Sequence, residues 1–175
     1  AILAGTVWIS SSYLRERVLA VAQEIHDYRS QNAGTSSGLR LEFWKKSIQL
    51  IAEAPIFGHG TGTIRDRFRA ISIGDSGASS AITDQPHQQT LIVAVQLGLV
   101  GAILLFGVWL SHLLLFRGGG FAAWLGFGVV VQNFVAGLFN SYLFEFTLGW
   151  VYVFGVGVLG GMVFRRRDSE ASRVD

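Results

Sequence analysis

The sequence predicts an all-α fold: a polytopic bundle of membrane helices with a large, partly helical extracytoplasmic loop. Half of the 175 residues are hydrophobic and only 15% are charged, whereas about 25% of the residues of an average soluble domain are charged. Apolar runs long enough to span a membrane follow one another in the second half of the chain, and they lack the alternation typical of a membrane barrel. The 22 glycines also suit helices that pack closely within a membrane.

The first half of the chain combines one short apolar segment with a long polar loop. Residues 1–9 are apolar and no basic stretch precedes them, so we expect the end of a membrane helix whose start is missing rather than a signal peptide. Residues 10–88 form the predicted loop, in which acidic and basic residues are nearly balanced. Three helices are expected within it, at Tyr13–Tyr28, at Leu39–Ala54 before Pro55, and at Ile64–Ile71.

The second half, residues 89–164, is predicted to hold three membrane helices. They correspond to the uncharged runs Thr90–Phe116, Phe121–Phe139 and Phe146–Phe164, since about 20 apolar residues suffice to cross a bilayer. Arg117 and the Arg165–Arg167 cluster mark the same side of the membrane two helices apart. The positive-inside rule makes that side cytoplasmic, so residues 165–175 form a cytoplasmic tail and the loop lies outside.

Charge and cysteine content exclude several classes of function. A net charge of +2 is too small to indicate a nucleic-acid partner, and the absence of cysteine excludes disulfides and thiolate metal sites. No spacing of histidine and acidic residues typical of a metal site is visible, and His26 and His112 look isolated. We therefore predict no metal and no cofactor.

His87 stands where the loop meets the first full membrane helix. Asp84 is a plausible N-cap and Pro86 suits the first helical turn. A helix N-terminus disfavours an imidazolium, and a neutral imidazole can act as a general base. The alternative is an interfacial histidine that only caps a helix.

The residues that follow His87 at helical spacing become small. Leu91, Ala94, Gly98 and Gly101 fall on the same stripe. Small residues on one stripe let another helix approach closely. We therefore expect a second helix to pack beneath the histidine.

Three arginines of the loop are candidate anion ligands. Arg40 is expected to begin the amphipathic helix on the face of Trp44, where its planar fork could hold a phosphate or its side chain could simply reach water. Arg65 and Arg69 lie four residues apart on the short basic helix. They could bind phosphate oxygens, although a solvated face is the commoner explanation of such a run.

Other polar positions carry weaker signals. The Gly58–Gly62 turn, which contains His59, is only superficially similar to a phosphate loop, because the lysine and the strand-to-helix setting are missing. Gln132 and Asn133 lie mid-membrane, where they either face a cavity or form hydrogen bonds between helices. Glu145 begins the last helix on the outer side.

Three motifs in order resemble the O-antigen ligase and polymerase superfamily of membrane glycosyltransferases. They are Arg40-Leu41-Glu42-Phe43-Trp44, the segment Glu53–Gly62, and Pro86-His87-Gln88. The ligases carry a histidine, then Asn, Ser or Gln, then nine residues and Gly-x-x-Gly, and His87, Gln88, Gly98 and Gly101 match this pattern with its spacing. The resemblance covers roughly residues 38–109.

The resemblance implies a multi-pass protein of the bacterial inner membrane whose loop, residues 10–88, is periplasmic. It implies metal-independent transfer of a glycan from an undecaprenyl-pyrophosphate carrier to an acceptor, lipid A-core in the ligases. Arg40 and His87 then correspond to the catalytic arginine and histidine. Arg65, Arg69, Gln88 and His59 are expected to bind substrate.

The chain departs from the family pattern because a further functional arginine, normally upstream, is missing. This fragment alone is therefore expected to be inactive without the rest of the protein. Two alternatives stay open at the level of sequence: a polysaccharide repeat-unit polymerase of the same superfamily, and a transporter or non-catalytic membrane protein.

Overall fold

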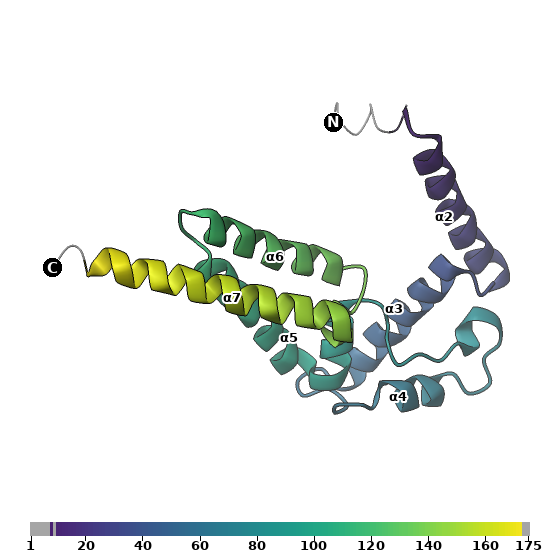
Figure 1. Ribbon diagram of the computed structural model, residues 1–175. Helices are drawn as coiled ribbons and strands as arrows, with labels where there is room; N and C mark the ends of the chain where they lie inside the picture. The colour runs from purple at the N-terminus through teal and green to yellow at the C-terminus, as the bar shows by residue number, and fades with distance from the viewer. Residues whose placement is uncertain (1–7, 9, 173–175) are drawn as a thin grey trace. The chain divides into compact units, whose positions relative to one another are not determined.

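The computed structural model of the protein describes residue 8 and residues 10–172. The described part is all-helical, with 76% helix and no strand, as predicted. The segment 1–9, expected to end a membrane helix, falls almost wholly outside it. The helices are α2 (Ser12–Gln31), α3 (Ser36–Glu53), α4 (Ile64–Ile71), α5 (Gln89–Leu115), α6 (Phe121–Gly137) and α7 (Phe146–Ala171), with 3-10 turns at Gly77–Ser80 and Tyr142–Phe144 (Figure 1).

The helices of the loop were predicted in the right places, but α3 begins earlier than Leu39. Its first turn is stabilised from outside, because the Glu24 carboxylate accepts a hydrogen bond from Ser37 N at 2.8 Å and Thr35 Oγ1 accepts one from Gly38 N at 3.2 Å. Satisfying these free N–H groups lets the helix start at Ser36. Arg40 therefore lies in the second turn of α3 and not at its head.

The chain divides into two compact units, and α3 and α4 each contribute to both. The first unit comprises residues 1–46 and 65–83. Its apolar contact is edge-to-face between Phe43 and Phe68, with ring centroids 6.0 Å apart. Tyr28 of α2 donates a hydrogen bond to the buried Glu42 of α3 at 2.5 Å, which ties these two helices together.

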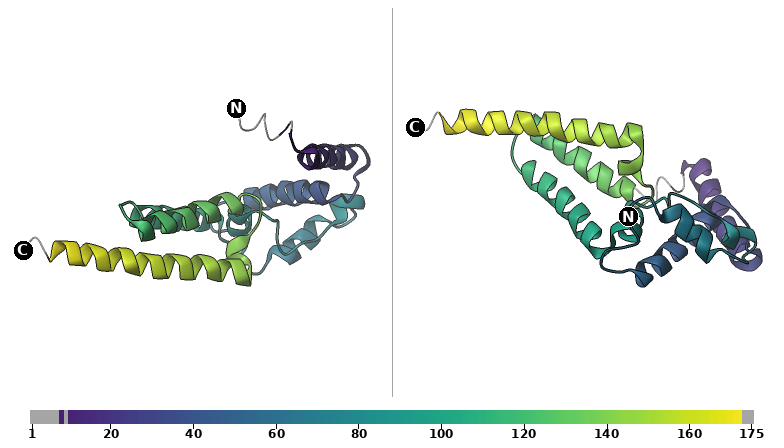
Figure 2. Two further views of the ribbon diagram at one scale, coloured as in Figure 1. Left: turned by 45° about the horizontal axis from the view of Figure 1, so that its top comes forward. Right: turned by 90° about the horizontal axis from the view of Figure 1, so that it is seen from below.

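The second unit comprises residues 47–64 and 84–175. Within it α6 packs against both α5 and α7 (Figures 1 and 2). Asn133 of α6 accepts a hydrogen bond from the indole N–H of Trp109 at 3.1 Å, and the two residues are buried. Asn133 thus forms a hydrogen bond between helices, one of the two roles considered for it, whereas Gln132 is exposed.

Within the part of the chain that the structure describes, two helices are long and apolar enough to cross a membrane, namely Gln89–Leu115 and Phe146–Ser169. The third predicted span is shorter than expected, since α6 ends at Gly137 after 17 residues. Large apolar side chains on these helices are exposed, among them Phe121 and Phe146, as lipid-facing positions require. The number of spans and their orientation stay predictions.

Candidate functional site

The histidine predicted to lie in the first turn of a membrane helix instead precedes that helix. α5 begins at Gln89, and its N-cap is Gln88, whose extended backbone (φ −158°, ψ 122°) and side chain cap the first turn. Gln88 Oε1 accepts a hydrogen bond from Leu91 N at 2.5 Å. The side-chain oxygen of Gln88 thus caps α5, and the substrate contact predicted for this residue stays a prediction.

The predictions of Asp84 as N-cap and of Pro86 in the first helical turn are therefore wrong. His87 has a φ of 54°, in the left-handed region that a right-handed helix excludes. The chain reverses at this residue, directly after the buried Pro86. Helix α5 cannot begin before it.

His87 heads a chain of hydrogen bonds that ends on a carboxylate. Its Nδ1 lies 3.1 Å from Asn140 Oδ1, within hydrogen-bond distance, and Asn140 Nδ2 donates to Glu145 Oε1 at 2.9 Å. All three side chains are partly buried. They belong to the second unit, where the segment between α6 and α7 meets the start of α5.

Residues beside this chain hold the segment between α6 and α7 in place. Gln89 is buried, and its Oε1 accepts a hydrogen bond from Leu143 N at 2.9 Å. Asn140 Oδ1 also accepts one from Ser141 N at 2.9 Å. Gln89 Nε2 and the hydroxyl of the buried Ser141 have no hydrogen-bond partner among the described residues.

The glycine turn after α3 packs against a break in α5. The predicted helical stripe through Gly98 is interrupted, because Gly98 adopts φ 60° and ψ −152°. A Cβ at Gly98 would lie 2.4 Å from the carbonyl carbon and oxygen of Ile56, and a Cβ at Gly58 would lie 2.4 Å from the carbonyl carbon of Gln96. The expectation that another helix packs here is wrong: a turn does, because backbone can approach backbone at two glycines.

Backbone hydrogen bonds join this turn to α5 on both sides of the break. They are His59 N to Val95 O (2.9 Å), Gly60 N to Gln96 O (2.8 Å), Leu99 N to Pro55 O (2.8 Å) and Val100 N to Ile56 O (3.2 Å). The turn thereby supplies partners to groups that the broken helix leaves unpaired. These hydrogen bonds join the motif Glu53–Gly62 to the motif that runs from His87 to Gly101.

His59 takes part in the same turn. Its ring Nε2 donates to Leu50 O, in the last turn of α3, at 2.8 Å. Both this ring nitrogen and its backbone N–H are thus engaged within the protein. These contacts favour a structural role for His59 over the substrate contact predicted for it.

The candidate arginines lie in the first unit, and the geometry leaves their roles as predictions. Arg40, Arg65 and Arg69 are exposed. Arg69 forms an ion pair with Asp66 at 2.9 Å. His87, by contrast, belongs to the second unit.

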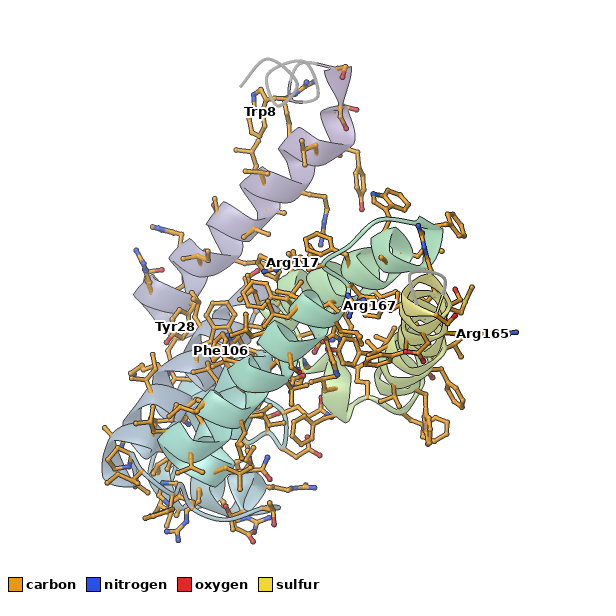
Figure 3. The ribbon with its side chains drawn as sticks, turned by 90° about the vertical axis from the view of Figure 1, so that its left-hand side faces the viewer. Trp8, Tyr28, Phe106, Arg117, Arg165 and Arg167 are labelled. Atoms are coloured by element: carbon orange, nitrogen blue, oxygen red, sulfur yellow. The ribbon has the colours of Figure 1, made fainter. Side chains whose placement is uncertain are left out.

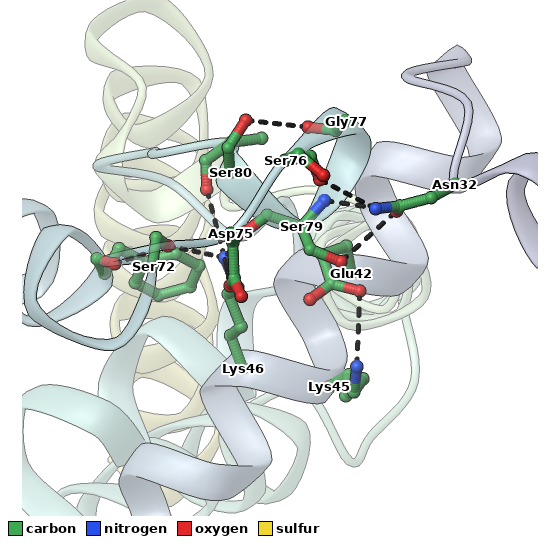
Figure 4. A network of polar contacts seen from close by, with 12 residues as sticks. Asn32, Glu42, Lys45, Lys46, Ser72, Asp75, Ser76, Gly77, Ser79 and Ser80 are labelled. Carbon is green, nitrogen blue, oxygen red and sulfur yellow. Dashed lines mark hydrogen bonds and ion pairs between the residues drawn. The ribbon is translucent and has the colours of Figure 1, made fainter.

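A buried lysine that the sequence analysis did not single out organises the first unit. Lys46 is only 4% exposed, and its ammonium donates to Ser72 Oγ at 2.5 Å and to Ser79 O, with Asp75 3.9 Å away (Figure 4). Burial lowers the pKa of Lys46, and the nearby Glu42 and Asp75 carboxylates oppose that effect. Every proton of this cation faces an acceptor or a charge, which indicates a structural role.

Arginines also surround the turn between α5 and α6. Arg166 Nη1 donates to Gly119 O and Arg167 Nη2 to Leu115 O, each at 3.1 Å. With Arg117 they line an open cavity of about 430 Å³. Arg165, by contrast, projects outward from α7 (Figure 3). Helix α7 continues through these arginines to Ala171, so most of the predicted tail is helical.

The partners of His87 were not found from the sequence. Glu145 was noted only as the start of a helix, and Asn140 was not singled out. The one available signal was that both are polar residues in a short link between apolar runs. Among the described residues no group of three or more histidine and acidic side chains could hold a metal ion.

Comparisons with known proteins bear on residues 1–106, which match a family model described as O-antigen ligase. A protein of Haemophilus influenzae, described only as uncharacterized, is 31% identical over 105 residues. That alignment covers 59% of this chain and 26% of the relative, so the chain spans about a quarter of the length of the relative. The family match includes Arg40 and His87 but ends before Asn140 and Glu145.

Proposed function

The chain belongs to the O-antigen ligase family, and on that premise we propose that it transfers a glycan from undecaprenyl-pyrophosphate to an acceptor such as lipid A-core. The family is a membrane protein family with glycosyltransferase-like activity in general. We place the reaction at the outer face of the bacterial inner membrane, with residues 10–88 in the periplasm. This topology is part of the proposal.

The observation that carries the proposal is the hydrogen-bonded setting of His87. A histidine with one ring nitrogen engaged by a fixed partner is held in orientation and presents its other nitrogen for proton transfer. Nδ1 of His87 has such a partner, since it lies 3.1 Å from Asn140 Oδ1, and we assign the proton transfer to Nε2. His87 also heads the motif that the ligases share.

The reaction needs one proton acceptor and positive charge at the leaving group. The acceptor hydroxyl oxygen attacks the anomeric carbon of the donor, the bond from that carbon to the pyrophosphate oxygen breaks, and His87 takes the hydroxyl proton. The electron pair of the broken bond leaves with undecaprenyl pyrophosphate. We assign Arg40, with Arg65 and Arg69, to that pyrophosphate, because guanidinium groups bind phosphate oxygens in a planar fork and stabilise developing negative charge.

The substrate contacts of the remaining residues follow from which atoms the fold leaves available. The Gln88 amide nitrogen, next to His87, is assigned to a hydroxyl or phosphate oxygen of the substrate. His59 is assigned to support of the glycine turn. No metal enters the proposed reaction, which places the electrostatic demand on the arginines.

The test is transfer by the purified full-length protein in liposomes, with undecaprenyl-pyrophosphate-linked glycan and lipid A-core, in the presence of a metal chelator. Loss of a general base lowers a rate by about 10²–10⁴-fold. The rate of transfer by His87→Ala is therefore expected to fall by that factor, while the variant still binds the donor. Transfer by His87→Ala within a few-fold of the unaltered protein would refute the assigned role. A second acceptor, carrier-linked repeat unit, separates a ligase from a polymerase.

A further inference from the structure

We propose that Asn140 and Glu145 are positioning residues that fix His87 in the Nδ1–H tautomer, so that its Nε2 is the atom that accepts the proton. The inference rests on the proposed function for its catalytic meaning. The tautomer itself is argued from hydrogen bonds that do not depend on the reaction. No sequence motif points to it, and both residues lie beyond the family match.

The direction of the chain of hydrogen bonds follows from its carboxylate end. An ionised carboxylate can only accept, so the amide group that contacts Glu145 Oε1 at 2.9 Å must be the NH₂ of Asn140. The amide oxygen then faces His87 Nδ1 at 3.1 Å. An amide oxygen can only accept, and therefore Nδ1 must carry the hydrogen.

A second contact fixes the same amide orientation independently of Glu145. Ser141 N donates to Asn140 Oδ1 at 2.9 Å, and a backbone N–H cannot accept. Both contacts therefore hold the oxygen of Asn140 on the side of His87. A flipped amide would place NH₂ against the Ser141 N–H and lose the bond to Glu145.

A neutral imidazole with its hydrogen on Nδ1 has its lone pair on Nε2. The partner of one ring nitrogen thus decides which nitrogen can act as a base, as the carboxylate or amide partner does in hydrolase triads. Here Asn140 supplies that partner and Glu145 orients Asn140. When His87 becomes an imidazolium during transfer, Asn140 Oδ1 continues to accept from Nδ1, so the ring does not need to turn.

The three side chains of His87, Asn140 and Glu145 form a hydrogen-bonded relay. The segment between α6 and α7, which carries Asn140 and Glu145, is held in place at both of its ends. Asn140 follows α6, whose buried Asn133 is bonded to Trp109 of α5. The 3-10 turn Tyr142–Phe144 that follows is bonded through Leu143 N to Gln89, at the start of α5. Hydrogen bonds therefore join the start of α5 to the segment that carries Asn140 and Glu145.

The first experiment reads the tautomer directly. Nitrogen NMR of the full-length protein with ¹⁵N-labelled histidine distinguishes protonated from unprotonated ring nitrogens, and a His87→Ala sample identifies the His87 signals among those of the other histidines. We expect a protonated Nδ1 and an unprotonated Nε2 at neutral pH. In Asn140→Leu the hydrogen should move to Nε2, whereas in Asn140→Asp, which keeps an acceptor facing Nδ1, it should stay. A hydrogen on Nε2 in the unaltered protein, or an unchanged spectrum in Asn140→Leu, would overturn the proposal.

The second experiment links the tautomer to transfer. Loss of the group that orients a metal-bound histidine typically costs about 10–100-fold. By analogy, Asn140→Leu should lose about that factor in kcat with little change in KM for the donor. The kcat of Asn140→Asp should lie within about tenfold of that of the unaltered protein, because aspartate still accepts a hydrogen bond from Nδ1. Ser141→Ala is the matched control, because its hydroxyl has no partner among the described residues, and it should transfer normally. Equal losses in Asn140→Leu and Ser141→Ala would indicate a merely structural segment and contradict the proposal.

The two experiments separate this inference from the proposed function. If His87→Ala still transfers glycan while the tautomer changes as expected in Asn140→Leu, the relay stands and the assignment of His87 as base is wrong. If His87→Ala is inactive but the His87 tautomer is unchanged in Asn140→Leu, the relay is wrong and the base assignment stands.

Discussion

Replacing Gly98 with alanine tests the contact between the glycine turn and α5 at the point where the helix breaks. A residue with a Cβ at φ 60° and ψ −152° costs about 1–3 kcal/mol in backbone strain. The added Cβ would also lie 2.4 Å from the carbonyl of Ile56 and 2.7 Å from Gly58 N. Because these neighbours are backbone atoms, no side-chain rotation can relieve the overlap.

The turn must therefore move away from α5, and its hydrogen bonds weaken as it moves. Four backbone hydrogen bonds span this contact, and each contributes about 0.5–1.5 kcal/mol net. Loss of half of them adds about 1–3 kcal/mol, which brings the expected destabilisation of Gly98→Ala to about 2–6 kcal/mol. The assay is denaturant unfolding of the full-length protein in detergent, followed by tryptophan fluorescence.

Gly107→Ala is the matched control in the same helix. A Cβ there would meet nothing within 4 Å, and alanine in place of glycine within a helix is favourable by about 0.5–1 kcal/mol. Gly58→Ala should resemble Gly98→Ala, since it disturbs the same contact from the other side, and the double variant should cost less than the sum. Equal stability of Gly98→Ala and Gly107→Ala, or strict additivity of Gly58→Ala and Gly98→Ala, would refute the reasoning.

Three further outcomes are expected. Arg40→Lys should lose most glycan transfer with normal expression, because a point charge does not replace a planar fork; transfer at the rate of the unaltered protein would reduce Arg40 to a solvated side chain. Tyr28→Phe should lower the free energy of unfolding by about 1–3 kcal/mol by leaving a buried carboxyl without its hydroxyl partner. Burial and the bond to Glu42 raise the pKa of Tyr28 to about 12, so the folded state holds this proton more tightly than the unfolded state. The contribution of Tyr28 to the free energy of unfolding is therefore present below about pH 10 and lost as pH rises toward 12. If stability depends on alkaline pH in the same way in Tyr28→Phe and in the unaltered protein, this reasoning is contradicted. Single cysteines at Ser36 and Ser169 should differ in labelling by an impermeant thiol reagent on intact cells, and labelling at position 169 but not at 36 would reverse the proposed orientation.

Local sequence was enough to locate most helices and the motif residues. Hydrophobicity and charge are properties of each side chain, so apolar runs show where a helix can be buried in lipid or protein whatever lies around it. The short helix Ile64–Ile71 was predicted at its observed bounds, and His87 was singled out from its motif. The start of α5 was misplaced because Gln88 competes with Asp84 as a cap, and the left-handed backbone of His87 decides between them.

Only the tertiary structure decided which polar groups meet. Asn140 lies 53 residues after His87, and its contact exists because α6 returns the chain to the start of α5. The break at Gly98 is stable because a turn some 40 residues earlier in the chain supplies the missing hydrogen bonds, and Lys46 is buried because carbonyls and hydroxyls of residues 72–81 close over it. Hydrogen bonds need partners at fixed distance and direction, and when those partners come from distant segments, no local pattern encodes them.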